Sequence, residues 1–397
     1  MHNIKNEALL SFLIRVSNSI GFFSVIPLLS LWLVDVKFIE ISMASFIVAS
    51  FTFMSKAGSF FVGGIINKLG LKPSLLIGLF GSAFTLLMIT YFSNYFTLLF
   101  FIVTLGFFIS LYNIALKTHI SMLEEAKRLN AYALLNIAVN VGASLGPLLG
   151  GLILDWNSYY LLIVSMLNYV FAGLVAILLP NSKLGLKENL NIFNFIKYRK
   201  DKKGFNTFLK FTLFSSLFWF LYTQIFTTFP IVFSHELSGK TIGVLFTINA
   251  ITIILIQGVF PKIQPYIRRE LWYSIAFMLI GVSFFVLWLY PQFPFVVIAI
   301  ILFSFSEIIW VPSIDNELVA NRGGLSSSWA FGVAGVIWGF GESIGSFVGL
   351  NFYYYFNDRT FLILFIISLI IFLTHILKIK FNNKLSKSSE YLEEEKV

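Results

Sequence analysis

The chain reads Gly142-Ala-Ser-Leu-Gly146-Pro-Leu-Leu-Gly150-Gly151 and, 199 residues later, Gly341-Glu-Ser-Ile-Gly345-Ser-Phe-Val-Gly349. The same offset takes Asn113 to Pro312. An internal repeat with so long a period indicates that the chain consists of two related halves. Both glycine-rich stretches lie within long apolar segments, so the surrounding composition decides what kind of halves these are.

The composition excludes a soluble protein. Of the 397 residues, 58% are hydrophobic and 12% are charged, with a mean hydropathy of +0.86, whereas soluble chains have about 45–50% apolar and about 25% charged residues. Phe alone supplies 47 residues, which a bilayer accepts but a soluble globule of this size does not hide. A soluble enzyme, a disordered chain and a nucleic-acid-binding domain are excluded, and the lack of Cys excludes disulfides and thiolate metal sites.

Apolar runs long enough to cross a hydrocarbon core of about 30 Å recur along the chain. The first shows no small-residue cleavage site, so we expect it to stay in the membrane rather than act as a cleaved signal. We expect twelve transmembrane helices, at approximately 8–33, 42–66, 73–93, 96–118, 130–154, 158–180, 208–233, 241–261, 271–290, 295–314, 326–350 and 360–378.

The basic residues predict the orientation, because cytoplasmic loops are enriched in Lys and Arg. One set of alternate loops holds only Lys37, Lys240 and Arg359. We therefore expect both termini in the cytoplasm, and we interpret the net charge of +9 as this loop bias rather than as a binding patch. The other set of loops holds most of the basic residues: Lys68, Lys72, Lys127, Arg128, Lys197, Arg199, Lys200, Lys202, Lys203, Lys262, Arg268, Arg269 and Arg322.

These observations predict an all-α integral membrane protein with two pseudo-symmetric six-helix bundles. We expect the first bundle at 1–180, a basic cytoplasmic linker at 181–207, and the second bundle at 208–378. The polar tail at 379–397 is expected to be disordered. Two bundles in the same orientation, joined by a cytoplasmic linker, are typical of secondary transporters that rock around a site at the membrane midplane.

The loop between the second and third spans reads Gly63-Gly-Ile-Ile-Asn67-Lys68-Leu-Gly70-Leu-Lys72. It resembles the signature of the major facilitator superfamily, and over its full length the chain resembles the bacterial drug:proton antiporter branch of that superfamily. Asn67 stands where the family has an acidic residue that helps to latch the two halves together. The resemblance therefore implies a latch that is weaker or differently built.

The fifth span resembles the antiporter motif of that branch, from Arg128 through Asn140 to the glycine-rich stretch at 142–151. Gly142, Gly146 and Gly150 leave one helix face without side chains, so a neighbouring helix can approach closely and slide, and Pro147 permits a bend. The alternative is that these glycines serve packing alone. The segment 106–113 lacks the basic residue that the family has in span four, so coupling schemes that use it do not apply.

Four charged residues lie deep within the predicted spans, where a charge is costly and marks a functional candidate. They are Arg15, Lys56, Glu307 and Glu342. The segment 307–312 resembles the span-ten pattern of the branch, with Ser306 in place of its glycine. A buried carboxyl group can take up and release a proton near neutral pH, so Glu307 is the first candidate proton carrier and Glu342 the second. The alternative is that each acid pairs with a base, Lys56 with Glu342 or Arg15 with Glu307.

Other side chains are candidates for lining a substrate cavity, although lipid contact or core packing is the alternative for each. We expect no metal site, because no His pair has ligand spacing on one face, and no cofactor or ATP site, because a phosphate-binding glycine loop is missing. The cavity candidates are Arg15, Lys56, Asn113, Trp219, Tyr222, Gln224 and Trp310, with Trp338 and Phe220 nearby.

The sequence predicts a transporter rather than an enzyme: a proton-driven exporter of small amphiphilic compounds in the bacterial cell membrane, functional as a monomer. An exporter of an anionic metabolite, such as a carboxylate siderophore, is an alternative because Arg15 and Lys56 give the first half a basic lining. A nutrient uptake symporter and a transport-inactive sensor are further alternatives. The expected partners are a small-molecule substrate, protons and lipids, but not nucleic acid.

The loop bias predicts which positions face the outside. Single cysteines at Ser238 and Asn357 are expected to react with an impermeant thiol reagent in whole cells, whereas one at Ser182 is not. The chain has no native Cys to complicate the labelling. Labelling of the Ser182→Cys variant from outside would contradict the orientation.

Overall fold

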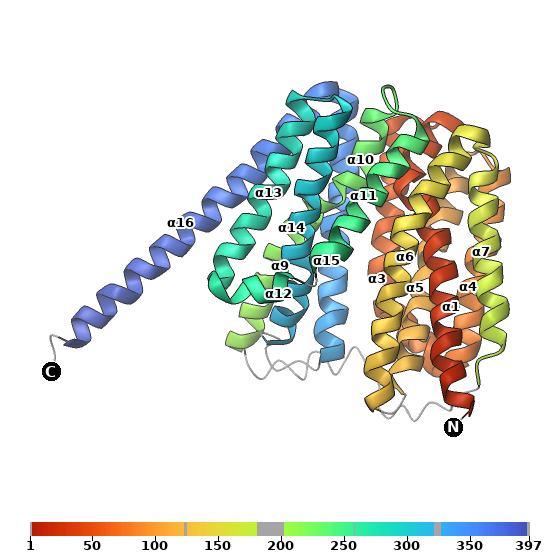
Figure 1. Cartoon of the computed structure of the whole chain (residues 1–397), viewed down its shortest axis with the longest axis horizontal. Helices are drawn as coiled ribbons and strands as arrows, with labels where there is room; N and C mark the ends of the chain where they lie inside the picture. Colours follow the sequence, from red (N-terminus) through yellow and green to blue (C-terminus); the bar gives the residue numbers. More distant parts are fainter. Residues whose placement is uncertain (1, 123–124, 181–201, 258, 321–326, 395–397) are drawn as a thin grey trace. The chain divides into compact units, whose positions relative to one another are not determined.

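The computed structural model describes residues 2–122, 125–180, 202–257, 259–320 and 327–394, and within these ranges the ordered elements are helical, with no strand (Figure 1). The long elements are α1 (His2–Val25), α3 (Ile41–Leu69), α4 (Leu71–Tyr91), α5 (Tyr95–Ser121), α6 (Glu125–Asn157), α7 (Tyr160–Ile177), α9 (Lys202–Tyr222), α10 (Gln224–Phe233), α11 (Gly239–Gln257), α13 (Arg269–Leu289), α14 (Phe293–Ala320), α15 (Ser327–Phe356) and α16 (Thr360–Glu394). The short elements are η1 (Ile26–Leu28), α2 (Leu29–Leu31), η2 (Trp32–Val36), α12 (Phe260–Ile263), η3 (Gln264–Tyr266) and η4 (Asn357–Arg359).

Eleven helical stretches of the described residues are long and apolar enough to cross a membrane. The expected count of twelve is therefore not confirmed. The difference lies at the C-terminal end, where a single stretch of 50 residues, Gly332–Phe381, includes most of α15, the short η4 and the first part of α16.

The two ends of the predicted second bundle differ from expectation. Residues 202–207 of the predicted linker already belong to α9, and 181–201 lie outside the described residues. The C-terminal tail is helical to Glu394 rather than disordered, because α16 continues through it without a Gly or Pro to end the helix.

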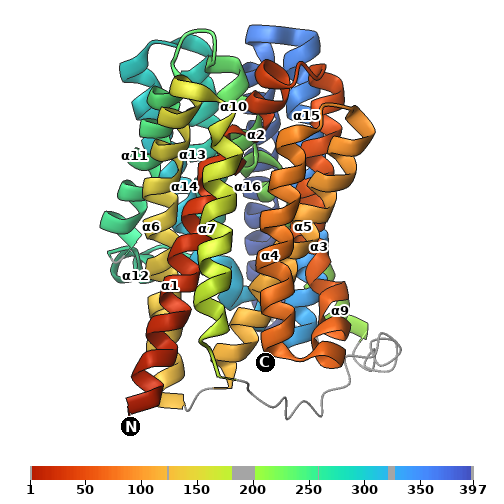
Figure 2. The same cartoon turned by 90° about the vertical axis from the view of Figure 1, so that its right-hand side faces the viewer.

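Within the described chain, the helices form two compact units. The first unit comprises 1–250 and 316–357, and the second comprises 251–315 and 358–397. In the first unit α1 packs between α6 and α7, and α3 packs on α5 and α15 (Figure 2). In the second unit α13 packs along α16. The division into six-helix bundles joined at 181–207 stays a prediction.

The predicted loop between the second and third spans is a turn of one residue. Gly70 separates α3 from α4 and has a φ of +92°, a backbone conformation that residues with a side chain rarely adopt. Lys72 then donates a hydrogen bond of 2.7 Å to the carbonyl oxygen of Ile177 at the end of α7. Lys68 is exposed and Gly63 is partly buried. The side chain of Asn67 lies outside the described residues, so the latch prediction is not tested.

The predicted glycine face of α6 packs directly on α1. A Cβ atom at Gly142 would meet Ser19, one at Gly146 would meet Phe23, and one at Gly150 would meet the backbone of Ser24. Such contacts are too short for any side chain, so the glycines permit the close approach of these two helices.

The glycine face of α15 repeats this arrangement in the second glycine-rich stretch. Gly341 lies against Ser216 and Gly345 against Phe220, both on α9, and Gly349 lies against Gln224 on α10. The three glycines of α15 correspond to those of α6 through the repeat offset, and their helical partners correspond as well. The internal repeat is therefore a repeat of helix packing and not only of sequence.

We expect a methyl group at Gly146 to destabilise the protein, because its Cβ would lie 2.7 Å from that of Phe23. Gly146→Ala should lower the free energy of unfolding by about 1–3 kcal/mol, the usual cost of overpacking, measured by thermal unfolding in nanodiscs. Gly64→Ala is the matched control, because nothing lies within 4 Å of a Cβ there. Equal melting temperatures for the two variants would contradict the packing argument.

Candidate functional site

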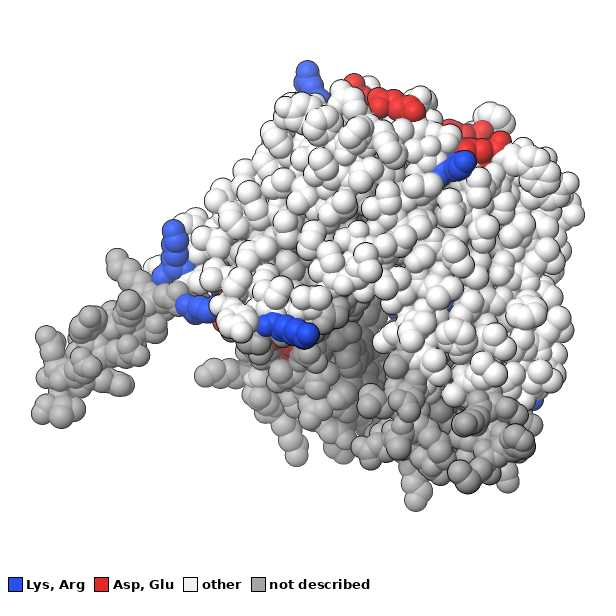
Figure 3. Space-filling view, in the orientation of Figure 1, with Lys and Arg blue, Asp and Glu red and all other residues white. Residues whose placement is uncertain are grey.

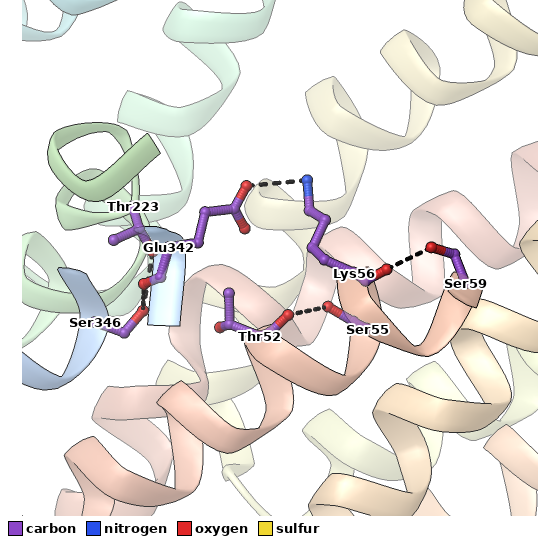
Figure 4. A network of polar contacts seen from close by, with 7 residues as sticks. All are labelled: Thr52, Ser55, Lys56, Ser59, Thr223, Glu342 and Ser346. Carbon is purple, nitrogen blue, oxygen red and sulfur yellow. Dashed lines mark hydrogen bonds and ion pairs between the residues drawn. The ribbon is translucent and has the colours of Figure 1, made fainter. Parts of the chain in front are cut away.

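Lys56 and Glu342 form an ion pair between α3 and α15 (Figure 4). The Lys56 Nζ lies 3.0 Å from the Glu342 Oε1, and both residues stand near the middle of their helices. The Glu342 side chain is only 9% exposed, whereas that of Lys56 is 43% exposed. One of the pairings considered from the sequence is thus confirmed, and it joins helices from the two predicted halves.

Neutral hydrogen bonds continue the contact between α3 and α15 beyond the ion pair. Ser343 donates to the carbonyl oxygen of Ala49 at 2.8 Å, and the Asn351 amide donates to the Ser45 hydroxyl at 2.9 Å. Gly339 approaches the Lys56 backbone so closely that a Cβ there would lie 3.0 Å from the Lys56 Cβ. The two helices therefore touch along a line of small and polar residues.

One aromatic ring of α9 lies beside the lysine, and it belongs to a cluster of rings from α9 and α15. The Lys56 Nζ lies 5.0 Å from the centre of the Trp219 ring, close enough for a cation–π interaction. The ring centres of Trp338 and Tyr222 lie 5.9 Å and 5.1 Å from that of Trp219. Two of the predicted cavity residues, Trp219 and Tyr222, thus belong to the surroundings of the ion pair, together with Trp338.

Sequence reasoning missed two hydroxyl groups next to Glu342, those of Ser346 and Thr223. Ser346 donates to the Glu342 carbonyl oxygen at 2.9 Å, and its hydroxyl lies 3.0 Å from that of Thr223, at the break between α9 and α10 (Figure 4). Ser346 occupies the repeat position of Pro147, which could have singled it out. The carboxylate therefore stands on a helix turn that is fixed to α9 and α10.

Gln224 is fully buried and connects two helices. Its amide group donates to the carbonyl oxygens of Gly345 at 2.8 Å and Phe220 at 2.9 Å, and its Oε1 accepts from Thr228 at 2.7 Å. All of its hydrogen-bonding groups thus have protein partners. In this conformation Gln224 holds α10 to α15 rather than facing a cavity.

Arg15 and Asn113 contact each other at another place in the first unit. The Arg15 guanidinium donates to the Oδ1 atom of Asn113, which connects α1 to α5. The sequence suggested Glu307 as a partner for Arg15. In the structure, the partner of Arg15 is instead the neutral side-chain amide of Asn113.

Glu307 and Trp310 belong to α14 in the second unit. Trp310 is buried and packs edge to face on Tyr273 and Phe277, with ring centres 5.2 Å apart in each case. Glu307 is partly buried, and the neighbouring Ser306 donates to the carbonyl oxygen of Ala276. The side chain of Pro312 lies outside the described residues. Trp310 is therefore a core residue in this conformation, and the role of Glu307 stays a prediction.

A second contact between the predicted halves joins α6 to α11. The Asp155 carboxylate accepts hydrogen bonds from the backbone N–H groups of Gly239 and Lys240, at 2.7 Å and 2.8 Å. Farther along, the Thr247 hydroxyl donates to the Ser144 carbonyl oxygen at 2.7 Å. Asp155 thus caps the first turn of α11, where an anion is favoured. No local sequence pattern predicts this contact, because the acid lies at the end of an apolar run.

Three further residues named in the motif, Asn140, Pro147 and Arg128, belong to α6. Asn140 is partly buried, and its carbonyl oxygen accepts from Ser144 at 2.8 Å. Pro147 is buried, and its carbonyl oxygen lies against Gly243 of α11. Arg128 belongs to the first turns of α6, but its side chain lies outside the described residues.

Charged side chains gather near the helix ends in the view of Figure 3, and most of the band between them is uncharged. Within the described residues, no group of three or more His, Asp or Glu side chains could hold a metal ion. The ion pair between α3 and α15 therefore stands out, because both of its charges lie near mid-helix.

Comparisons with known proteins agree with this architecture. The pattern of the family described as "Major Facilitator Superfamily" matches residues 11–321. A Bacillus subtilis (strain 168) protein named "Uncharacterized MFS-type transporter YqjV" is 27% identical over 305 residues, which cover 73% of this chain and 72% of that protein.

Two solved structures share the fold at low sequence identity. A proton dependent oligopeptide transporter aligns with a TM-score of 0.76 at 14% identity, covering 95% of this chain and 98% of that one. The human organic anion transporter MFSD10 aligns with a TM-score of 0.64 at 18% identity, covering 94% of this chain and 99% of that one.

The ion pair makes a testable statement about stability. Lys56→Met leaves the buried Glu342 carboxylate without its cation, so we expect a loss of about 2 kcal/mol, less than the roughly 3–5 kcal/mol of a fully buried pair because Lys56 is partly exposed. The double variant Lys56→Met/Glu342→Gln should recover part of this loss in thermal unfolding. Additive losses would show that the two side chains do not interact.

Proposed function

The chain belongs to the Major Facilitator Superfamily, and on this premise we propose that it is a proton-coupled exporter of small amphiphilic organic compounds that works by alternating access. The Lys56–Glu342 ion pair carries the proposal. Its energy source is the proton gradient, so the proposal requires no cofactor. Protons and one small organic molecule are the exchanged species.

A carboxylate within an apolar helix is stable in its charged form only beside a cation. A movement that separates Glu342 from Lys56 therefore favours uptake of a proton by Glu342, and a movement that brings Lys56 back favours its release. Because the two residues belong to α3 and α15, protonation is coupled directly to the contact between these helices. The ion pair thus acts as a switch that links the proton to the conformational change.

The surroundings of the ion pair suit an amphiphilic cargo. Trp219, Trp338 and Tyr222 provide aromatic faces beside a charged group, and aromatic rings bind both apolar surface and cations. Lys56 is considerably exposed at mid-helix, where a charge is stable only if it faces water or a partner. We infer that this exposed part faces the path along which cargo passes.

The likeness of α6 to the antiporter motif supports export rather than uptake. In the proposed cycle the glycine contacts of α6 on α1 allow these helices to slide. The fold also occurs in a protein named as a proton dependent transporter, so it is compatible with coupling to protons. Glu307 in α14 is a second candidate carrier, and the same experiment tests it.

The experiment uses everted membrane vesicles, in which an imposed pH gradient drives accumulation of a fluorescent amphiphilic dye, measured in separate assays with cationic ethidium and with anionic pyrenebutyrate. Glu342→Gln is expected to abolish accumulation against a gradient, since an amide cannot exchange a proton, while downhill counterflow of the dye persists. Glu307→Gln is measured in parallel. If gradient-driven accumulation is lost in that variant and kept in Glu342→Gln, the proton carrier is Glu307.

Glu236→Gln is the matched control, because Glu236 lies in the loop between α10 and α11 and is expected to leave transport unchanged. Gradient-driven accumulation that survives in both the Glu342→Gln and the Glu307→Gln variants would contradict proton coupling at these sites. Dye uptake driven in the opposite direction would contradict export.

A further inference from the structure

A seam of polar side chains runs between α1 and α5, away from the ion pair. At one end the Glu7 carboxylate lies 3.7 Å from the His119 Nε2. Deeper in the helices, the Arg15 guanidinium donates to the Asn113 amide oxygen. Arg15 lies roughly 12 Å from the start of its candidate span and Asn113 roughly 10 Å from the matching end of its own, by helical rise. The two side chains thus meet at one depth inside the membrane-spanning part.

Arg15 has no acidic partner in the part of the chain that the structure describes. Its hydrogen-bond partner there is the neutral amide of Asn113, and the ion pairs found among these residues involve other bases. Lys56 and Glu342 neutralise each other, so the guanidinium adds one positive charge to the interior of the first unit. A guanidinium offers five N–H donors, and an uncompensated charge at this depth indicates a missing anion.

Asn18 supplies an independent observation. It lies three residues beyond Arg15, on the same side of α1, and it is 0% exposed. Neither its Nδ2 nor its Oδ1 atom has a hydrogen-bond partner among the described residues. Each such buried group costs about 1–3 kcal/mol if it stays unsatisfied. Ser11, one turn before Arg15, is buried with an unpartnered hydroxyl as well.

Two buried tyrosines border Arg15. Tyr112 of α5 and Tyr169 of α7 pack edge to face, with ring centres 5.8 Å apart, and Arg15 lies near enough to act electrostatically on both phenol groups. Both rings are buried, and a low local dielectric strengthens the attraction between a nearby cation and an anion.

We propose that Arg15, with Asn113 and Asn18, forms a subsite for the carboxylate group of a monoanionic amphiphilic cargo. The planar guanidinium matches a carboxylate through two parallel hydrogen bonds, and the Asn18 amide provides a further donor of the right kind. A single negative charge fits, because one positive charge is left uncompensated. The apolar part of the cargo would lie against the surrounding aromatic and aliphatic side chains.

This inference rests on the proposed function, since it assigns the chemical class of the exported compound. It uses different residues, however, so the two statements can fail separately. The coupling pair holds its charges within the protein, whereas the Arg15 subsite takes its negative charge from the cargo. Equilibrium binding therefore tests the subsite without any proton gradient.

The experiment measures binding of three matched fluorescent probes to the full chain in phosphatidylcholine nanodiscs: pyrenebutyrate, its methyl ester, and a pyrenebutyl trimethylammonium ion. Wild type should bind the carboxylate at least about tenfold more tightly than the ester, as expected for a charge-assisted hydrogen bond. Arg15→Gln should remove this preference and Arg15→Lys should keep part of it, because only the lysine retains the charge.

Asn18→Ala should weaken carboxylate binding severalfold and leave binding of the ester unchanged, which tests the subsite even if Arg15→Gln does not fold. Arg359→Gln, an exposed arginine of η4, is the matched control and should bind all three probes as wild type does. Equal affinity of wild type for carboxylate and ester would overturn the proposal. Displacement of pyrenebutyrate by phosphatidylglycerol added to the nanodiscs would also overturn it, since the site would then belong to an anionic lipid.

The outcomes separate the subsite from the proposed transport cycle. Preferential carboxylate binding in a protein without gradient-driven transport would leave the subsite standing and overturn the exporter. If the protein transports a dye with the proton gradient but binds carboxylate and ester equally, the exporter is supported and the Arg15 subsite is overturned.

Discussion

The cost of an unpartnered charge or polar group in an apolar environment governs the interior of this protein. Water is not available within a hydrocarbon core, so each charged side chain there needs a partner or a water-accessible path. Lys56 and Glu342 meet that requirement with each other, and the backbone groups meet it within the helices. Arg15 meets it only in part, through a neutral amide, which is why the two sites lead to different interpretations.

The position of the ion pair depends in turn on glycine packing. Gly341 and Gly345 let α15 approach α9 closely, and this approach holds Glu342 beside the Lys56 side chain and the Trp219 ring. A larger residue at either glycine would move α15 outward. Gly341 and Gly345 are thus packing residues, and through that packing they set the geometry of the charged site.

Composition and repeat were enough to predict the all-α membrane fold, because a bilayer constrains helix length and polarity strongly. The superfamily was implied by the resemblance of the loop at 63–72 to a family signature. The sequence also suggested two acid–base pairs, and the structure contains one of them, Lys56 with Glu342. It could not predict that Asn113 is the partner of Arg15, or that Asp155 caps α11, because both contacts join helices far apart in the chain and neither has a local spacing signal. The count of spans was less secure, since α15 and α16 follow each other with only η4 between them.

The repeat also explains why the α3–α15 contact has an ion pair that the related α6–α11 contact lacks. Ser343 of α15 donates to the Ala49 carbonyl oxygen of α3, and Thr247 of α11 donates to the Ser144 carbonyl oxygen of α6. These two contacts occupy nearly corresponding places in the repeat, so both helix pairs share a neutral connection. At the position of Glu342 only the pair of α3 and α15 adds a charge, because that position corresponds to Ala143 in α6. The Asp155 carboxylate lies farther along, near the end of α6. With Ala143 at the corresponding position, the contact of α6 with α11 keeps a neutral hydrogen bond beside it, whereas α3 and α15 add the ion pair to theirs.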